Sequence, residues 1–288
     1  MDALVSGLVL GGLYALVALG FVLTFVTTRT LNFALGEFIS AAGFLVIGAA
    51  AILSAHPAAL IAFAVLAAGA AGAFVERFVV RPFARGEHDV RWLLTTVGLS
   101  MLLLNLLQNS QGAATRSLGM ANLAGAVAFG PIRVGRQALV IAVLAVVVTG
   151  VLVWFTQRTA IGAVVRAVAE DRDTVSLMGV NPTVIAVGSY VLAMSIAALA
   201  GVLWSAQVGV SLDLGATLLV AGFAAAIMGG LDSFLGPLVG GMLYGVTTQM
   251  TAFYAGSTLG SVAGLLLLVA ILAVRPQGIL GRVVGQKV

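Results

Sequence analysis

The sequence has no cysteine, few histidines and few charged residues, and each scarcity removes a class of protein. Without cysteine there is no disulfide and no thiolate metal site, and His56 and His88 are too few for a histidine-rich metal site. Charged residues make up 8% of the 288 residues, whereas a soluble domain carries roughly 25%. Such a chain cannot cover itself with a water-facing surface, so we predict a membrane protein.

Lysine is almost absent as well. Lys287 is the only lysine, and no serine or threonine follows it, so the Gly-Lys-Ser/Thr sequence of a phosphate-binding P-loop is missing. We therefore expect this chain not to hydrolyse ATP. The missing Gly-x-Ser-x-Gly nucleophile motif disfavours an intramembrane protease, and the missing Thr-Val-Gly-Tyr-Gly filter disfavours a channel. We predict no catalytic residue, no metal site and no cofactor.

What the sequence does contain is long apolar runs, close to the roughly 20 residues that a helix needs to cross a bilayer. The candidate spans are residues 4–26, 31–53, 58–80, 92–107, 139–155, 183–206, 214–228, 234–254 and 259–274. The fourth and seventh runs are short, so we predict an all-α polytopic bundle of eight or nine transmembrane helices, with some spans short or broken. Residues 1–288 are expected to form one transmembrane domain.

The arginines predict the orientation, because basic residues gather on the cytoplasmic side of membrane proteins. One set holds 11 of the 14 basic residues: Arg29, Arg77, Arg81, Arg85, Arg91, Arg158, Arg166, Arg172, Arg275, Arg282 and Lys287. Arg116, Arg133 and Arg136 are left for the other side. The N-terminus is then outside, the C-terminus is cytoplasmic, residues 157–182 form a cytoplasmic loop and residues 108–136 form an external loop. The basic residues are scattered between apolar runs, so they do not indicate nucleic-acid binding.

The cytoplasmic loop is the most polar stretch of the chain. Arg166 and Glu170 are spaced to face each other one helical turn apart, Gly179 suits a helix end, and Pro182 blocks continuation. Val164, Val168, Val175 and Met178 fall roughly on one side of a helix. The residues alone allow two interpretations: a short amphipathic helix outside the membrane, or a solvated loop whose charges fix the topology.

Two further polar groups lie near predicted span ends. Asn32 and Glu37 come just after Arg29, where a carboxylate facing lipid would cost about 2–3 kcal/mol. Glu37 either caps a helix start and pairs with Arg29, or belongs to a broken helix that lines a conduction path. The turn containing Gly230 and Asp232 is predicted to be tight, and Asp232 is a candidate cap for the next helix.

Glycines spaced by four residues recur in the apolar runs, and small residues at that spacing let helices approach closely in a membrane. The pairs are Gly7/Gly11, Gly236/Gly240, Gly241/Gly245, Gly256/Gly260 and Gly260/Gly264. We predict a tightly packed bundle.

Several segments carry a family likeness. Residues 31–37 read Leu-Asn-Phe-Ala-Leu-Gly-Glu, close to the motif Ile-Asn-Phe-Ala-His-Gly-Glu, and residues 76–82 read Glu-Arg-Phe-Val-Val-Arg-Pro. Residues 162–181 follow a Gly…Arg-Ala…Ala-Glu-Asp…Leu-Met-Gly-Val-Asn pattern, and residues 275–278 read Arg-Pro-Gln-Gly. In this order the segments resemble the integral membrane permease subunit of branched-chain amino-acid ABC importers.

The resemblance implies that the cytoplasmic loop docks a coupling helix into an ATPase subunit, because residues 173–179 match the spacing of the family's Glu-Ala-Ala-x-x-x-Gly loop. The implied coupling residues are Arg166, Glu170, Asp171, Asp173, Leu177, Met178 and Gly179. The implied translocation path includes Asn32, Gly36, Glu37, Gly230 and Asp232. The chain departs from the family at Leu35, where histidine is frequent, and at Asp232, where glycine is usual.

The same resemblance implies an inner-membrane location and a set of partners. These are two cytoplasmic ABC ATPase subunits that use the ATP, a second homologous permease subunit or a second copy of this chain, an external or periplasmic solute-binding protein, and membrane lipids. The expected function is ATP-driven import of branched-chain or related amino acids by a chain that is not itself an enzyme. The alternatives are an importer of urea or short amides and an ion-coupled secondary transporter.

Overall fold

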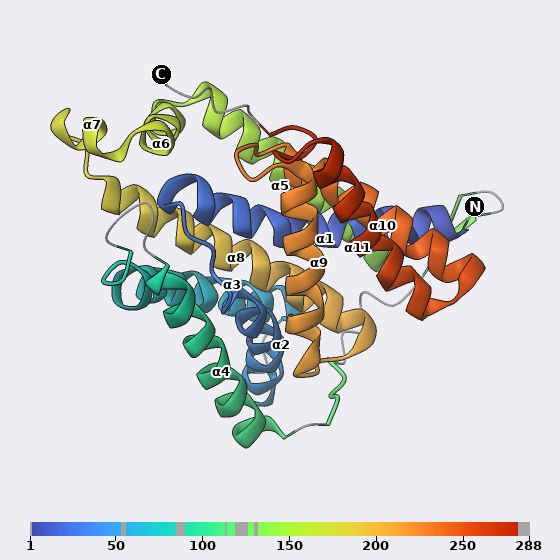
Figure 1. Cartoon of the computed structure of the whole chain (residues 1–288). Coiled ribbons are helices and arrows are strands. Elements are labelled where there is room, and N and C mark those ends of the chain that lie inside the picture. Colours follow the sequence, from blue (N-terminus) through green and yellow to red (C-terminus); the bar gives the residue numbers. More distant parts are fainter. Residues whose placement is uncertain are drawn as a thin grey trace. The chain divides into compact units, whose positions relative to one another are not determined.

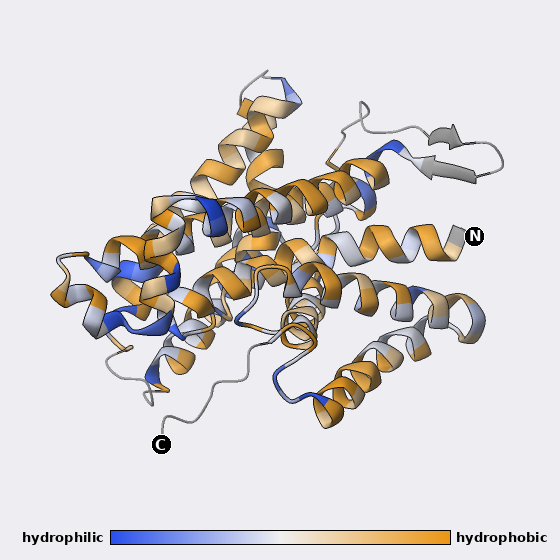
Figure 2. Cartoon of the chain, turned by 90° about the horizontal axis from the view of Figure 1, so that it is seen from above, coloured by the Kyte–Doolittle hydropathy of each residue, from blue (hydrophilic) through white to orange (hydrophobic). Residues whose placement is uncertain are grey.

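The computed structural model describes residues 2–52, 56–84, 90–112, 114–118, 126–129 and 132–281 (Figure 1). Arg85, His88, Arg282 and Lys287, which the sequence analysis used, lie outside these residues. Helices occupy every candidate run, so the predicted all-α polytopic fold is confirmed. Figure 2 shows that hydrophobic residues dominate the long helices, whereas hydrophilic residues gather toward helix ends and connections.

The long helices match the candidate runs in order. They are α1 (Asp2–Thr28), α2 (Leu35–Ile52), α3 (Pro57–Phe74) continued by the π-helix η1 (Val75–Val80), α4 (Arg91–Gln111), α5 (Arg136–Arg158), α8 (Pro182–Val208), α9 (Asp213–Gly229), α10 (Gly236–Ala255) and α11 (Ser257–Val274). Two shorter helices, α6 (Ala160–Glu170) and α7 (Arg172–Leu177), lie between α5 and α8.

Within the described ranges, seven helices are long and apolar enough to cross a membrane: α1, α2, α3 with η1, α4, α5, α8 and α11. The apolar helix α9 has only 17 residues, and the 20-residue α10 carries Thr247, Thr248 and Gln249 in its middle. The chain is therefore a multi-pass membrane protein.

Two predicted boundaries need correction. The second run was expected to begin at residue 31, but α2 begins at Leu35, because residues 29–34 form a non-helical segment. The fourth run was expected to be short, but α4 has 21 residues, because the helix continues through Gln108 and Gln111. Polar residues can continue a helix beyond its apolar run, so hydropathy alone underestimated the length of α4.

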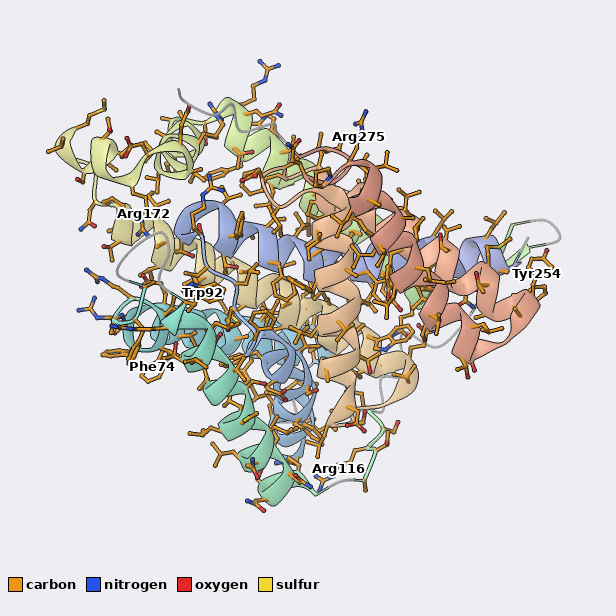
Figure 3. The ribbon with its side chains drawn as sticks, viewed as in Figure 1. Phe74, Trp92, Arg116, Arg172, Tyr254 and Arg275 are labelled. Carbon is orange, nitrogen blue, oxygen red and sulfur yellow. The ribbon has the colours of Figure 1, made fainter. Side chains whose placement is uncertain are left out.

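The external loop predicted over residues 108–136 contains a small antiparallel hairpin. Strand β1 (Ala126–Phe129) pairs with β2 (Ile132–Gly135), with Ala126 opposite Gly135. Arg116, after the end of α4, forms a separate antiparallel bridge with Val210, through N–H···O distances of 3.0 and 2.8 Å (Figure 3). This bridge joins the loop to the α8–α9 connection.

By their internal contacts the residues form two compact units. Unit 1 comprises Met1–Val22, Gly125–Trp154 and Val220–Val288, and unit 2 comprises Leu23–Ala124 and Phe155–Leu219. The predicted single domain over residues 1–288 stays a prediction.

Unit 1 is organised by glycines where α1 crosses α10. A Cβ added to Gly11 would lie 2.8 Å from the Gly241 carbonyl oxygen, and a Cβ added to Gly241 would lie 2.6 Å from the Gly11 oxygen. The two backbones therefore touch, as the four-residue glycine spacing predicted for Gly7/Gly11 and Gly241/Gly245. Next to this crossing, Tyr14 and Tyr244 make an edge-to-face contact with ring centroids 5.6 Å apart.

Unit 2 is built around α8, which contacts both α2 and α3. Tyr190 and Met194 of α8 are fully buried. The Ser195 hydroxyl of α8 donates a hydrogen bond to the Val65 carbonyl of α3 at 3.2 Å. Helix α4 contacts α2 and η1, whereas α6 and α7 contact each other and α8 (Figure 1). Most of the predicted functional residues therefore belong to this unit.

Candidate functional site

The polar loop leaves α5 through a capped, tightly packed turn. The Thr159 hydroxyl accepts a hydrogen bond from the Gly162 backbone N–H at 2.9 Å and donates one to the Phe155 carbonyl at 2.7 Å. A threonine at this position satisfies an N–H group that the helix leaves free. A Cβ on Gly162 would lie 2.6 Å from the Thr156 Cα, so α6 is fixed closely against the end of α5.

The loop contains two helices, not the single helix expected from Arg166 to Gly179. Asp171 has extended backbone, with φ −155° and ψ 106°, and separates α6 from α7. Its carboxylate accepts hydrogen bonds from the Thr174 backbone N–H at 3.0 Å and the Thr174 hydroxyl at 2.6 Å. The prediction of one continuous helix was wrong because Asp171 caps the second helix, a role that aspartate favours over a helix interior.

The tip of α7 exposes two apolar side chains. Leu177 is 88% exposed and Met178 is 75% exposed, although Val175 beside them is buried. Gly179 has φ +83°, a conformation that suits glycine after a helix end, as predicted. The Asn181 side chain then accepts a hydrogen bond from the Thr183 N–H at 3.0 Å and caps α8. Met178 was expected to fall on the same side of a helix as Val175, but α7 ends at Leu177, before Met178.

The buried side of α6 is formed by Val165 and Val168, and the charged side chains of Arg166 and Glu170 are exposed. Asp171 is exposed and Arg172 is half-buried at the start of α7 (Figure 3). Asp173 lies within α7. The structure thus brings all the predicted coupling residues into one helical loop, which favours the amphipathic interpretation over a solvated loop.

The start of α2 is a buried polar site. Glu37 is only 6% exposed, and its Oε1 accepts a hydrogen bond from the Ser100 hydroxyl of α4 at 3.1 Å. Its Oε2 is buried without a hydrogen-bond partner among the described residues. Within the described residues, the hydrogen-bond partner of Glu37 is Ser100 and not the suggested Arg29, whose Nη2 donates to the Ala169 carbonyl at 2.8 Å.

Asn32 and Gly36 complete this helix start. The Asn32 Oδ1 accepts a hydrogen bond from the Ala34 N–H at 3.1 Å, which caps α2. Gly36 packs against the beginning of α9, where an added Cβ would lie 3.0 Å from the Gly215 oxygen. The Ser40 hydroxyl donates to the Leu212 carbonyl at 3.1 Å and accepts from the Gly215 N–H at 2.8 Å. Asn32, Gly36 and Glu37 therefore line one interface of unit 2.

Gly230 and Asp232, the remaining path candidates, belong to unit 1. Gly230 has φ +104°, and a Cβ there would lie 2.8 Å from the Gly281 Cα. This turn receives the segment after α11, whose Ile279 N–H donates to the Met228 carbonyl at 2.8 Å. Close packing therefore accounts for Gly230. Asp232 does not cap α10, because the N-cap residue is Leu235 and no side chain bonds there.

Comparison with known proteins shows the family to which this architecture belongs. Residues 3–274 match the family described as "Branched-chain amino acid transport system / permease component". The chain belongs to this family. Within the described ranges of this permease component, no group of three or more histidine or acidic side chains is arranged to hold a metal ion. The expectation that it needs no cofactor stays an expectation.

Relatives cover nearly the whole permease. It is 32% identical to the high-affinity branched-chain amino acid transport system permease protein BraD of Pseudomonas aeruginosa, over 100% of this chain and 98% of BraD. It is 28% identical to the corresponding protein LivH of Escherichia coli, over 100% of this chain and 97% of LivH. Among solved structures, PsaBC from Streptococcus pneumoniae shares the fold with a TM-score of 0.50 and 13% identity, covering 96% of this chain and 91% of that one.

The sequence analysis did not single out three polar residues of the permease: the buried Ser40 and Glu76 and the half-buried Ser100. Ser100 bonds Glu37, Ser40 holds the start of α9, and Glu76 is a carboxylate only 3% exposed in the π-helix η1. Glu76 lies within electrostatic range of Arg81 and Arg172. Its sequence signal was its position as the only acid in the run of residues 58–80, where an ionisable group is expensive and needs a partner.

Proposed function

We propose that this permease is the membrane subunit of an ATP-driven importer that carries branched-chain amino acids across the inner membrane. The names of BraD and LivH, branched-chain amino acid transport system permease proteins, support the substrate class, and the missing P-loop requires separate ATPase subunits. A second permease subunit, two ATPase subunits and an external solute-binding protein complete the assembly. The N-terminus lies outside and the C-terminus in the cytoplasm, in agreement with the arginine distribution.

The observation that carries the proposal is the exposed apolar pair Leu177 and Met178 at the tip of α7. Covering one such side chain stabilises a complex by roughly 1.5–3 kcal/mol. The Thr159, Asp171 and Asn181 caps hold the two helices and the start of α8 in place, so little conformational freedom is lost when a partner covers the tip. A short, preorganised helix with an apolar tip suits insertion into a groove of an ATPase subunit.

In this mechanism, closure of the ATPase pair on ATP displaces α7 and α6. The displacement reaches the transmembrane helices through α8, which both short helices contact, and through α5, against which Gly162 packs. The permease then alternates between outward-facing and inward-facing states. Its own residues bind the ATPase subunits and transmit the displacement to the membrane helices, and they perform no bond-breaking step.

The test is co-purification of a tagged permease, co-expressed with candidate ATPase, permease and binding-protein subunits, in mild detergent. The double variant Leu177→Ser with Met178→Ser removes the apolar tip. It should weaken ATPase binding at least about 30-fold, since contacts at the centre of an interface contribute about 2 kcal/mol or more each. Leucine uptake into proteoliposomes should fall in parallel.

A matched control is Leu235→Ser, which removes a 44% exposed leucine from the α9–α10 connection, outside the α6–α7 loop. This control should bind the ATPase normally. Full ATPase binding by the Leu177/Met178 variant would refute the coupling role of α7. A wild-type permease that purifies without any P-loop ATPase would refute the importer, and uptake of urea in preference to leucine would refute the substrate class.

A further inference from the structure

We propose that Arg29 is the positioning residue that joins the α6–α7 loop to the start of α2. Residues 29–34, called the strap here, connect α1 to α2 without helical structure. Through Arg29, a displacement of α6 would move the strap and with it the polar helix start at Asn32 and Glu37. This inference deepens the proposed function and rests on it, because it says how movement of the loop reaches the membrane helices.

The first observation is the backbone of Arg29. It has φ +54°, and it is the only non-glycine residue of the described ranges with a positive φ. A bulky residue reaches this left-handed region only when its surroundings hold it there, and such residues gather at functional and switch regions. The strained conformation turns the chain sharply after α1 and starts the strap.

The second observation is the contact that the Arg29 side chain makes. Its Nη2 donates a 2.8 Å hydrogen bond to the carbonyl of Ala169, the penultimate residue of α6. The last four carbonyls of a helix have no partner within it, and the helix dipole makes this end negative, so a guanidinium is well suited to it. Arg29 therefore caps a helix that lies 140 residues further along the chain.

The guanidinium is also oriented from the α1 side. The Arg29 Cζ lies 5.4 Å from the centre of the Phe25 ring, a cation–π arrangement. One face of the guanidinium thus contacts the end of α1 while its edge bonds the end of α6. A guanidinium that is held on its face and at its edge transmits displacement better than one that is free to change rotamer.

The third observation is that the strap is anchored along its length. The Thr30 hydroxyl lies 2.7 Å from the Thr28 hydroxyl and 3.0 Å from the hydroxyl of Tyr190, which is fully buried on α8. Further along, Asn32 caps α2 at the Ala34 N–H. The strap therefore carries movement as one piece to the first turn of α2, where Glu37 bonds Ser100 of α4.

Substitution of Arg29 separates this role from strain and from topology. Arg29→Gly removes the guanidinium but adopts φ +54° without strain, so the complex should still assemble. Arg29→Lys keeps the charge that favours the cytoplasmic side and loses the planar, multiply donating group. The complete importer is reconstituted in proteoliposomes, and leucine uptake is measured per ATP hydrolysed.

We expect Arg29→Gly to hydrolyse ATP while its uptake per ATP falls about tenfold, and Arg29→Lys to recover part of the ratio. A wild-type ratio in Arg29→Gly would overturn the proposal. If the wild type transports, and the Leu177/Met178 variant loses ATPase binding but Arg29→Gly is normal, then only the role of Arg29 fails. A wild type without an ATPase partner refutes the proposed function itself.

A second readout uses the absence of cysteine from the chain. Phe33→Cys places a single thiol in the strap, and its labelling rate is measured in the full complex with and without trapped ATP. Trapping should change the rate at least threefold when Arg29 is present and leave it unchanged in Arg29→Gly or Arg29→Gln. An equal change in these variants would contradict the proposal, and so would failure of all three Arg29 variants to assemble, which would assign Arg29 to folding alone.

Discussion

The helices inside unit 1 and the helices inside unit 2 pack by different kinds of contact. In unit 1 the α1–α10 crossing brings backbone against backbone, with glycines on both helices and no room for a Cβ. In unit 2 the helix starts are joined by side-chain hydrogen bonds, at Glu37–Ser100, Ser40–Gly215 and Thr30–Tyr190. Both kinds of contact hold helices together inside a lipid bilayer, where burial of apolar surface away from water contributes little to helix association.

The two kinds of contact predict different tolerance to substitution in each unit. A glycine crossing depends on the absence of atoms, so any larger residue separates the helices along their whole contact. A hydrogen-bonded contact depends on particular atoms, so its loss costs the free energy of one or two bonds and leaves the packing in place. The expected effects of substitution therefore rank from unit 1 to unit 2.

The largest effect is expected for Gly11→Leu. The new side chain would meet the backbone of Gly241 and Met242, which has no flexible group to move aside. We expect a loss of at least about 3 kcal/mol of stability and little folded protein in the membrane. Fluorescence-detected size exclusion measures this, with Gly150→Leu as control, because nothing lies within 4 Å of a Cβ at Gly150. Similar folded yields for both variants would contradict the backbone contact.

Ser40→Ala tests the hydrogen-bonded side of the comparison. It leaves the Gly215 N–H and the Leu212 carbonyl without their serine partner and should cost about 1–3 kcal/mol. The control is Ser205→Ala, since the fully buried Ser205 hydroxyl has no hydrogen-bond partner within the described residues and its removal should be neutral or stabilising. Thermal unfolding in detergent compares the two, and an equal shift in Tm would refute the assignment.

A smaller effect is expected at Tyr190. Tyr190→Phe removes only the hydroxyl that meets Thr30, and hydrogen bonds between membrane helices average about 0.6 kcal/mol. A double-mutant cycle with Thr30→Val, followed by chemical unfolding, isolates this coupling. Additive effects of the two substitutions would show that the 3.0 Å contact contributes nothing to stability.

The smallest effect on stability is expected for Glu37→Gln, smaller than for Tyr190→Phe, because the amide fills the same volume and can still accept the Ser100 hydrogen bond. Transport is the informative measurement here. If this helix start borders the translocation path, leucine uptake by equal amounts of reconstituted importer should fall severalfold. A normal uptake rate would leave Glu37 with a structural role only, through its hydrogen bond to Ser100.

The sequence was sufficient for the features that depend on composition and spacing. Apolar run length predicted each long helix, glycine spacing predicted close helix packing without saying which helices meet, and Gly179 marked the end of α7. These features are local or periodic, so they can be recognised without knowledge of the partner segment.

The features that the sequence analysis missed depend on distant partners. Arg29 was matched with the nearby Glu37, but its partner Ala169 lies 140 residues away and bonds through its backbone, which carries no side-chain signal. Ser100 was not singled out, because its bond to Glu37 requires α4 to lie beside α2. The break at Asp171 was local, however, and the Asp-x-x-Thr spacing of an N-cap could have predicted it.

The way the chain returns to the Gly230 turn decides where this permease can be labelled. Ile279 and Leu280 each donate a backbone hydrogen bond to the turn at the end of α9, and Gly278 and Gly281 fit where larger residues would clash. Affinity tags and fluorescent fusions should therefore be attached beyond residue 281, with a linker, so that these backbone hydrogen bonds stay intact. A truncation after Val274 would instead leave the backbone of that turn unpaired, and such a shortened chain is a poor starting point for purification.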